Sequence, residues 1–166
     1  MLVAGSFLAF KTMGTGTNTK NRSTPPSKYE QILKLVGGWL AEAHYSPQDI
    51  NDAFSQKIFK KFIGDLDPDK NMFLKSDMAS LKKYENTIDE EIKGAPVEFF
   101  LAAGKVFNSR MEESSVMYAE YLAQPFDFTV NEEIVLDTDK LDFPESAAER
   151  KDRWRKKVKF MTLERY

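Results

Sequence analysis

The sequence of 166 residues contains no cysteine and only one histidine, His44. Without cysteine, disulfide bonds, thiolate metal sites, a cysteine nucleophile and a lipidated cysteine are all excluded. A single histidine also excludes metal sites built on two histidines. His44 lies near the expected end of a helix, where the dipole favours an imidazolium, so we expect a local structural role for it.

The sequence also lacks an apolar run long enough to cross a bilayer. Residues 2–10 (LVAGSFLAF) are apolar but number only nine, whereas a transmembrane helix needs about 20. That length suits the central region of a secretory signal, although no Lys or Arg precedes it and no clear Ala-x-Ala site follows. The alternative is a disordered or loosely packed N-terminus. Residues 14–26 are polar and rich in Gly, Thr and Pro, so we assign 1–26 to a leader and linker.

No charge of one sign dominates. Lys and Arg number 24 and Asp and Glu number 26, a net charge of −2, which gives no electrostatic reason to expect nucleic acid as a partner. A hydrophobic content of 42% with 30% charged residues is ordinary for a globular protein. The length suits one domain with a working core.

Apolar residues at three- and four-residue intervals predict helices over most of residues 27–166. Ser27 and Glu30 form a capping-box pattern that begins the first helix, and Gly37 and Gly38 within it permit close packing or a bend. Ser46-Pro47 is the predicted start of the second helix. Its wide apolar face comprises Ile50, Ala53, Phe54, Ile58, Phe59, Phe62, Ile63 and Leu66.

Beyond the stop at Asp67-Pro68, the apolar plug Met72-Phe73-Leu74 precedes a third helix, predicted from Ser76 or Asp77 to just before Gly94. A fourth, long helix is predicted over 96–123. Its apolar seam comprises Phe99, Phe100, Ala103, Val106, Phe107, Met111, Met117, Tyr118, Tyr121 and Leu122.

The helical period disappears over 126–136, where a strand or an extended arm is expected. The last helix begins with a second capping-box pattern, Ser146 and Glu149, and is expected to continue to Tyr166. Because no C-terminal stop signal follows it, we expect the chain to be the front part of a larger protein. The predicted fold is mainly α, a bundle of about five helices with an extended or short β crossing before the last one.

Three groups of residues invite a functional interpretation. The acidic loop over 65–71 fails as a calcium-binding EF-hand in both registers, since neither supplies the required glycine and twelfth-position carboxylate. We interpret it as turn and capping chemistry. Ser114 and Ser115 lie in mid-helix, and a lysine base for either would have to be desolvated. We therefore expect no catalytic, cofactor-binding or metal-binding residue in this chain.

The third group is a basic cluster around Trp154. Nucleic acid or anionic lipid is one possible partner for such a cluster. Acidic residues are interleaved with it, so a solvated helix face or an interdomain docking surface is the preferred interpretation. Its members are Arg150, Lys151, Arg153, Arg155, Lys156, Lys157 and Lys159. The 13 phenylalanines exceed what a small bundle needs, and we expect a neighbouring domain or partner to cover part of the apolar surface.

Three stretches together resemble the N-terminal region of the tail-specific, or C-terminal processing, proteases of Gram-negative bacteria. They are residues 44–78 (HYSPQDINDAFSQKIFKKFIGDLDPDKNMFLKSDM), residues 125–129 (PFDFT) and residues 154–160, which run from tryptophan to KVKF. The order and spacing of these stretches make the resemblance specific, and it covers about residues 29–163.

The resemblance implies a periplasmic serine endopeptidase that acts on proteins with apolar C-termini. It implies a PDZ domain and a Ser/Lys catalytic domain after this region, and a helical-repeat lipoprotein as an adaptor in some members. None of the catalytic positions transfers to these 166 residues. We therefore expect a non-catalytic helical scaffold and docking domain, inactive alone and without a cofactor, over residues 27–166. A free-standing helical adaptor is the alternative.

Overall fold

A computed structural model describes residues 27–47 and 49–165. The mainly helical prediction is confirmed, and the described residues contain no strand. The six α-helices are α1 (Lys28–Gly38), α2 (Asp52–Leu66), α3 (Lys75–Leu81), α4 (Ile88–Lys93), α5 (Phe99–Leu122) and α6 (Ala147–Leu163). A π-helical turn (Trp39–Ala43) extends α1, and 3-10 turns occupy Lys82–Tyr84 and Thr138–Lys140. The predicted leader over 2–10 lies outside the described residues.

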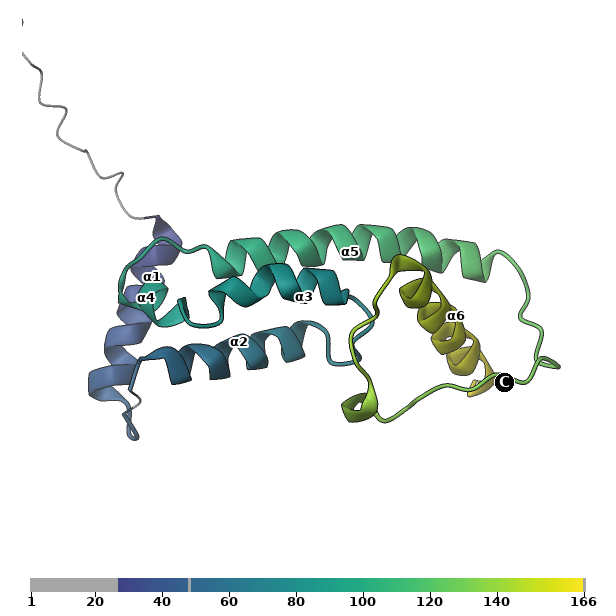
Figure 1. The fold of residues 1–166 in the computed structure, drawn as a ribbon, viewed down its shortest axis with the longest axis horizontal. Coiled ribbons are helices and arrows are strands. Elements are labelled where there is room, and N and C mark those ends of the chain that lie inside the picture. Colours follow the sequence, from purple (N-terminus) through teal and green to yellow (C-terminus); the bar gives the residue numbers. More distant parts are fainter. Residues whose placement is uncertain (1–26, 48, 166) are drawn as a thin grey trace, which may run out of the picture.

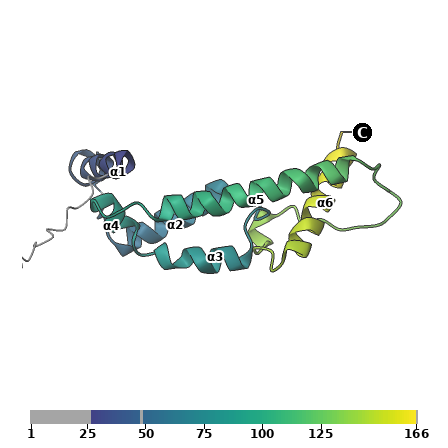
Figure 2. The ribbon, with the colours of Figure 1, turned by 90° about the horizontal axis from the view of Figure 1, so that it is seen from above.

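The helices form an elongated bundle. Helices α2, α3 and α5 run along its length, α1 crosses one end beside α4, and α6 lies at the other end (Figure 1). The view from above separates α1 and α6 in the same way (Figure 2). Helix α1 contacts α4, and α5 contacts both α3 and α6. Within the described residues, no helix has the length and hydropathy needed to span a membrane.

The core lies between α2, α3, α4 and α5. The predicted plug Met72-Phe73-Leu74 is buried throughout, which confirms its role in the connection. Aromatic rings add directional contacts, with the Phe59 and Phe99 ring centroids 5.2 Å apart. The central buried cluster comprises Phe59, Ile63, Phe73, Leu81, Ile88, Ile92, Phe99 and Ala103.

Helix α1 begins as predicted. The Glu30 amide donates to the Ser27 hydroxyl over 3.3 Å, and the Ser27 amide donates to the Glu30 carboxylate over 2.5 Å. Gly37 is buried against Ile92, and the helix changes to π-helical geometry after Gly38. Gly37 therefore allows close packing, and Gly38 directly precedes the change from α-helical to π-helical geometry.

The predicted start of the second helix is wrong by several residues. Helix α2 begins at Asp52, because the Asn51 side chain accepts from the Phe54 amide over 3.1 Å and caps it. Ser46 instead donates its amide to His44 Nδ1 over 3.1 Å.

The predicted third helix is divided in two. It starts at Lys75 and stops at Leu81, and α4 begins only at Ile88 after a 3-10 turn. A buried contact anchors the second part, since the Asp89 amide donates to the Ser55 hydroxyl over 2.8 Å. That hydroxyl donates in turn to the Asp89 carboxylate over 2.8 Å. This link to α2 is non-local, so helical spacing along the chain did not reveal it.

The predicted apolar seam of the long helix is only partly correct. Helix α5 buries Phe99, Ala103 and Met117. Four other predicted members are about half exposed, because the seam drifts around a straight helix over this length. They are Phe100, Met111, Tyr118 and Leu122.

The crossing before α6 is irregular, so a strand is not confirmed there. Ser146 caps α6 by accepting from the Glu149 amide over 3.2 Å. The return bond is displaced by one residue, since Glu149 accepts from the Glu145 amide over 2.8 Å. Helix α6 ends at Leu163 and does not continue to the last residue as predicted.

Candidate functional site

His44 forms a local contact at the end of the π-helical turn. Its Nδ1 atom lies 2.7 Å from the carbonyl oxygen of Ser46. Ser114 and Ser115 are near neighbours in mid-α5, but their hydroxyls lie against Met72 sulfur at 3.8 Å and the Glu112 carbonyl at 2.8 Å, respectively. Among the described residues, the structure brings no general base to either serine, and it gathers no group of three metal-ligating side chains.

The acidic loop is a capping structure around one carboxylate. Asp67 is buried and accepts from the backbone amides of Asn71, Met72 and Phe73, over 2.8, 2.9 and 3.0 Å. These bonds fold the chain back between α2 and α3 and place the apolar plug in the core. The interpretation as turn and capping chemistry is confirmed for this loop.

Of the two interpretations preferred for the basic cluster, a solvated helix face or an interdomain docking surface, the first does not hold for Arg150, which is buried. The Arg150 side chain is only 1% exposed and forms an ion pair with Glu113 of α5. It also donates to the Met72 carbonyl over 3.2 Å. Burial lowers the pKa of Arg150 despite the Glu113 charge beside it. This residue therefore fastens α6 to the bundle.

Arg110 extends the same ionic network toward α3. Its guanidinium donates to both Asp77 carboxylate oxygens, over 2.8 and 2.9 Å, and to Glu113 over 2.8 Å. Burial alone would raise the pKa of Asp77, but hydrogen bonds from Arg110 and the Leu74 amide outweigh it, so the pKa is lowered. Asp77, Arg110, Glu113 and Arg150 thus join α3, α5 and α6.

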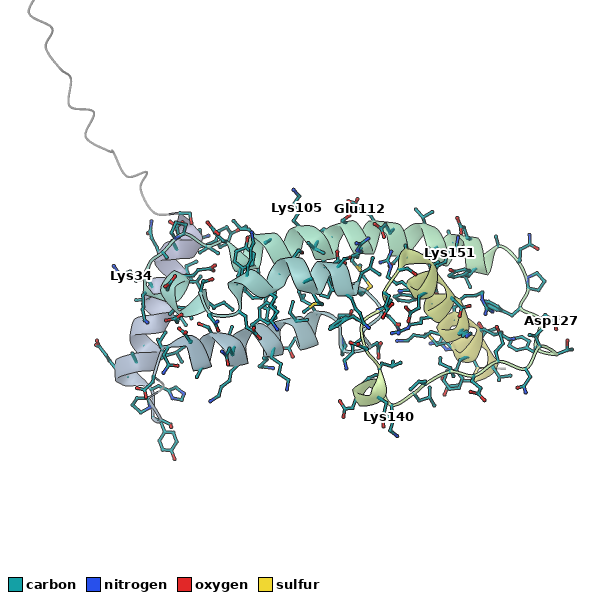
Figure 3. All side chains as sticks on the ribbon, in the orientation of Figure 1. Lys34, Lys105, Glu112, Asp127, Lys140 and Lys151 are labelled. Atoms are coloured by element: carbon teal, nitrogen blue, oxygen red, sulfur yellow. The ribbon has the colours of Figure 1, made fainter. Side chains whose placement is uncertain are left out.

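Other cations of α6 hold neighbouring segments. Figure 3 shows Lys105 and Glu112 pointing outward from α5, whereas Lys151 lies at the junction of α6 and α5 and pairs with Glu120 over 2.6 Å. Trp154 donates its ring N–H to the Asn71 carbonyl over 2.8 Å. These contacts join α6 to α5 and to the connection before α3.

Glu132 connects α6 to the crossing. It pairs with Arg155, and with Lys159 over 2.6 Å. Hydrogen bonds from Arg155 and then Lys159 lower the pKa of Glu132 to about 2, so this carboxylate stays charged at neutral pH. The crossing is consequently held beside α6.

An apolar surface at the opposite end of the bundle has no cover among the described residues. It surrounds a hollow of about 420 Å³ on α1 and the turn after it. Trp39 is 71% exposed and Tyr45 is 99% exposed, values unusual for large apolar side chains grouped together. We call this surface the α1 patch; its residues are Leu35, Val36, Trp39, Leu40, Ala43, His44 and Tyr45.

Sequence reasoning missed the ionic network and the α1 patch as units. Arg150 belonged to a basic cluster whose pattern resembled a solvated face, and Arg110 stood out in no pattern. The apolar stripe of the first helix was visible, but spacing alone does not tell which apolar faces another helix covers. Only the excess of apolar residues gave a signal for an uncovered surface.

Comparison with known proteins agrees with the resemblance found in the sequence. Residues 38–166 match a family model described as the tail specific protease N-terminal domain. A tail-specific protease of Haemophilus influenzae is 29% identical over 121 residues, which make up 72% of this chain. The matched region spans only 17% of that relative's length.

Proposed function

The chain belongs to the tail-specific protease N-terminal domain family, and from that membership we propose that it is a non-catalytic scaffold and docking domain of a C-terminal processing serine endopeptidase. In this function, residues 27–166 pack against the PDZ and protease domains of the parent protein. The domain helps to enclose protein substrates with apolar C-termini. A helical-repeat lipoprotein is the proposed adaptor.

The observation that carries the docking function is the α1 patch. Burying an apolar side chain of this size is worth about 1.5–3 kcal/mol relative to leaving it in water. A cluster that includes Leu35, Trp39 and Tyr45 is therefore a costly surface to leave exposed. Cover by an adjoining domain removes that cost.

The surroundings of Ser114 and Ser115 support the proposed non-catalytic role. The Ser115 hydroxyl donates to a carbonyl of its own helix, and Ser114 faces a methionine sulfur. Activation of a serine as a nucleophile needs an adjacent base or a depressed pKa. Neither hydroxyl has such a neighbour among the described residues.

The docking test uses the whole chain and the PDZ–protease body of a tail-specific protease prepared without its N-terminal domain. Calorimetry is expected to detect binding. A double variant, Leu35→Ser with Trp39→Ser, is expected to weaken binding at least about 100-fold, since it removes two apolar side chains that the complex would bury. The matched control, Leu101→Ser with Val116→Ser, changes apolar residues that are 57% and 61% exposed on α5 and is expected to bind normally.

A peptidase assay tests the second part of the proposal. The chain alone is expected to leave a tagged polypeptide with an apolar C-terminus intact. Hydrolysis by the chain that disappears in Ser114→Ala or Ser115→Ala would contradict the non-catalytic assignment.

The α1 patch equally suits a free-standing adaptor, which is the alternative function. The same calorimetry distinguishes the two, because an adaptor binds the substrate polypeptide through the α1 patch without the protease body, and the Leu35→Ser, Trp39→Ser double variant then loses that binding. The periplasmic location is proposed from family membership and from the leader-like residues 2–10. It is tested by fusing residues 1–26 to a reporter enzyme that folds only after export.

A further inference from the structure

Residues 131–136 (NEEIVL) form an extended segment without a strand partner. Their backbone N–H and C=O groups make no hydrogen bond with any described residue. Over residues 131–135 the side chains alternate, since Glu132 and Ile134 are half-buried while Asn131, Glu133 and Val135 are exposed; Leu136, which is 65% exposed, ends the alternation. This period of two is that of a strand with one covered face. The segment thus has the side-chain pattern of a strand, but no other described segment pairs with its backbone.

Helix α6 holds this segment in place. Glu132 pairs with Arg155 and Lys159, and Lys159 also donates to the Val130 carbonyl over 3.1 Å. An extended backbone that is already fixed loses little conformational entropy when another strand pairs with it. The segment is therefore prepared for strand addition.

A groove lies between the segment and α6, and we call it the α6 groove. Its volume is about 560 Å³, and its apolar lining is made by Ile134, Val135, Leu136, Leu141, Phe160 and Met161. A peptide occupant offers apolar side chains to such a surface.

The charges around the α6 groove indicate which charge its occupant carries. Its cations are already neutralised, since Lys157 pairs with Asp69, Arg153 with Glu149 and Lys156 with Asp152. Glu133 and Glu164 also line the groove, and neither forms an ion pair with any described residue. The uncompensated charge is therefore negative.

We propose that residues 131–136 and the α6 groove bind an extended segment of another polypeptide, with alternating apolar side chains flanked by lysine or arginine. The occupant adds as a β-strand to the 131–136 backbone, its apolar side chains enter the groove, and its cations face Glu133 and Glu164. A second copy of this chain is disfavoured, because it would bring a second Glu133 and Glu164 to the same place. This inference goes beyond the docking function, since the groove is lined by α6 and the α1 patch by α1, and these two helices lie at opposite ends of the bundle (Figures 1 and 2).

The test measures binding of a fluorescent peptide, Lys-Val-Thr-Val-Thr-Val-Lys, to the full chain by anisotropy. Two further peptides carry N-methyl groups on alternate residues. One peptide is methylated on the N–H groups that point to one edge of the strand, and the other on those that point to the opposite edge. Strand addition predicts that one methylated peptide loses at least about fivefold in affinity, since it loses backbone hydrogen bonds, while the other binds normally. Equal binding by both methylated peptides, or equal loss in both, overturns the proposal.

Variants of the chain provide a second measurement. Val135→Pro removes an unpaired N–H in the segment and is expected to weaken binding about fivefold. Val130→Pro is the matched control, because Val130 and Val135 are both 51% exposed but Val130 lies outside the α6 groove. Glu133→Lys is expected to reverse the preference toward a peptide flanked by glutamate. Circular dichroism checks that each variant is folded.

The remaining outcomes also decide the question. Absence of saturable peptide binding overturns the proposal. Self-association of the chain that Val135→Pro abolishes overturns it too, because the occupant is then a second copy. Failure of the protease body to bind leaves this result untouched, since that experiment concerns the α1 patch.

Discussion

Gly37 of α1 lies so close to Ile92 of α4 that a Cβ atom at position 37 would clash with Ile92 Cγ2 and lie 3.1 Å from its carbonyl oxygen. The absence of a side chain at position 37 therefore lets the backbone of α1 pack directly against α4. Gly38, its neighbour, has nothing within 4 Å of the corresponding position.

Gly37→Ala is expected to destabilise the chain by about 2 kcal/mol, because the added methyl group overpacks the α1–α4 contact. Gly38→Ala is the matched control and is expected to stabilise it by up to about 1 kcal/mol, since its backbone is helical and alanine favours helix. Urea denaturation measures both. Equal effects of the two changes would contradict the packing role of Gly37.

Asp67→Ala is expected to destabilise the chain by about 3 kcal/mol. Three backbone amides lose their charged acceptor, and the plug at Met72 and Phe73 loses its anchor. Asp65→Ala serves as the control, because Asp65 is exposed and Lys61, also exposed, is its only ion-pair partner within the described part of the chain. Its effect on the free energy of unfolding is expected to stay below about 1 kcal/mol. A small effect of Asp67→Ala would contradict the role of the capping loop.

Glu113→Ala is expected to cost about 3 kcal/mol, because it leaves the guanidinium of Arg150 buried without its counter-charge. Glu120→Ala removes another α5–α6 ion pair, with Lys151, but both of those side chains are about half exposed. We expect that control to change stability little. Thermal unfolding in low and high salt compares the two variants, and an equal loss in both would contradict the buried network.

Glu91→Gln is expected to remove a pH dependence of stability. Glu91 of α4 is buried, and its carboxylate accepts at the start of α5 from the Phe99 amide over 2.8 Å and the Glu98 amide over 3.1 Å. Burial raises the pKa of Glu91 above its ordinary 4.5, against the effect of these hydrogen bonds. At a pH above the raised pKa, the ionised Glu91 therefore lowers the free energy of unfolding. This destabilisation is lost as the pH falls through the raised pKa, and it is absent below the pKa of Glu91 in the unfolded chain.

Glutamine keeps a carbonyl acceptor for the same two amides. The variant is thus expected to be at least as stable as the wild type at pH 7, with the difference vanishing below about pH 4. Urea denaturation between these pH values measures it, with the exposed Glu90→Gln as the control. The prediction would be contradicted if Glu91→Gln were less stable than the wild type at pH 7 while the two were equally stable at low pH.

The sequence alone determined the features that depend on near neighbours along the chain. Helical spacing gave the mainly α fold, Ser27 and Ser146 marked helix starts, and the aspartate-rich turn was identified as capping chemistry. Each of these signals acts within about one helical turn, so it is readable from spacing. The order of the motifs also indicated the family.

Tertiary structure decided the features that depend on distant partners. The Ser55 hydroxyl of α2 forms hydrogen bonds with Asp89 of α4, in the second part of the divided third helix. Glu113 of α5 forms an ion pair with the buried Arg150 of α6. Residues 131–136 have strand character, but a strand needs a second backbone to pair with, and no described residue supplies one. Burial and pairing are properties of the packed chain, because they join groups that the sequence holds tens of residues apart.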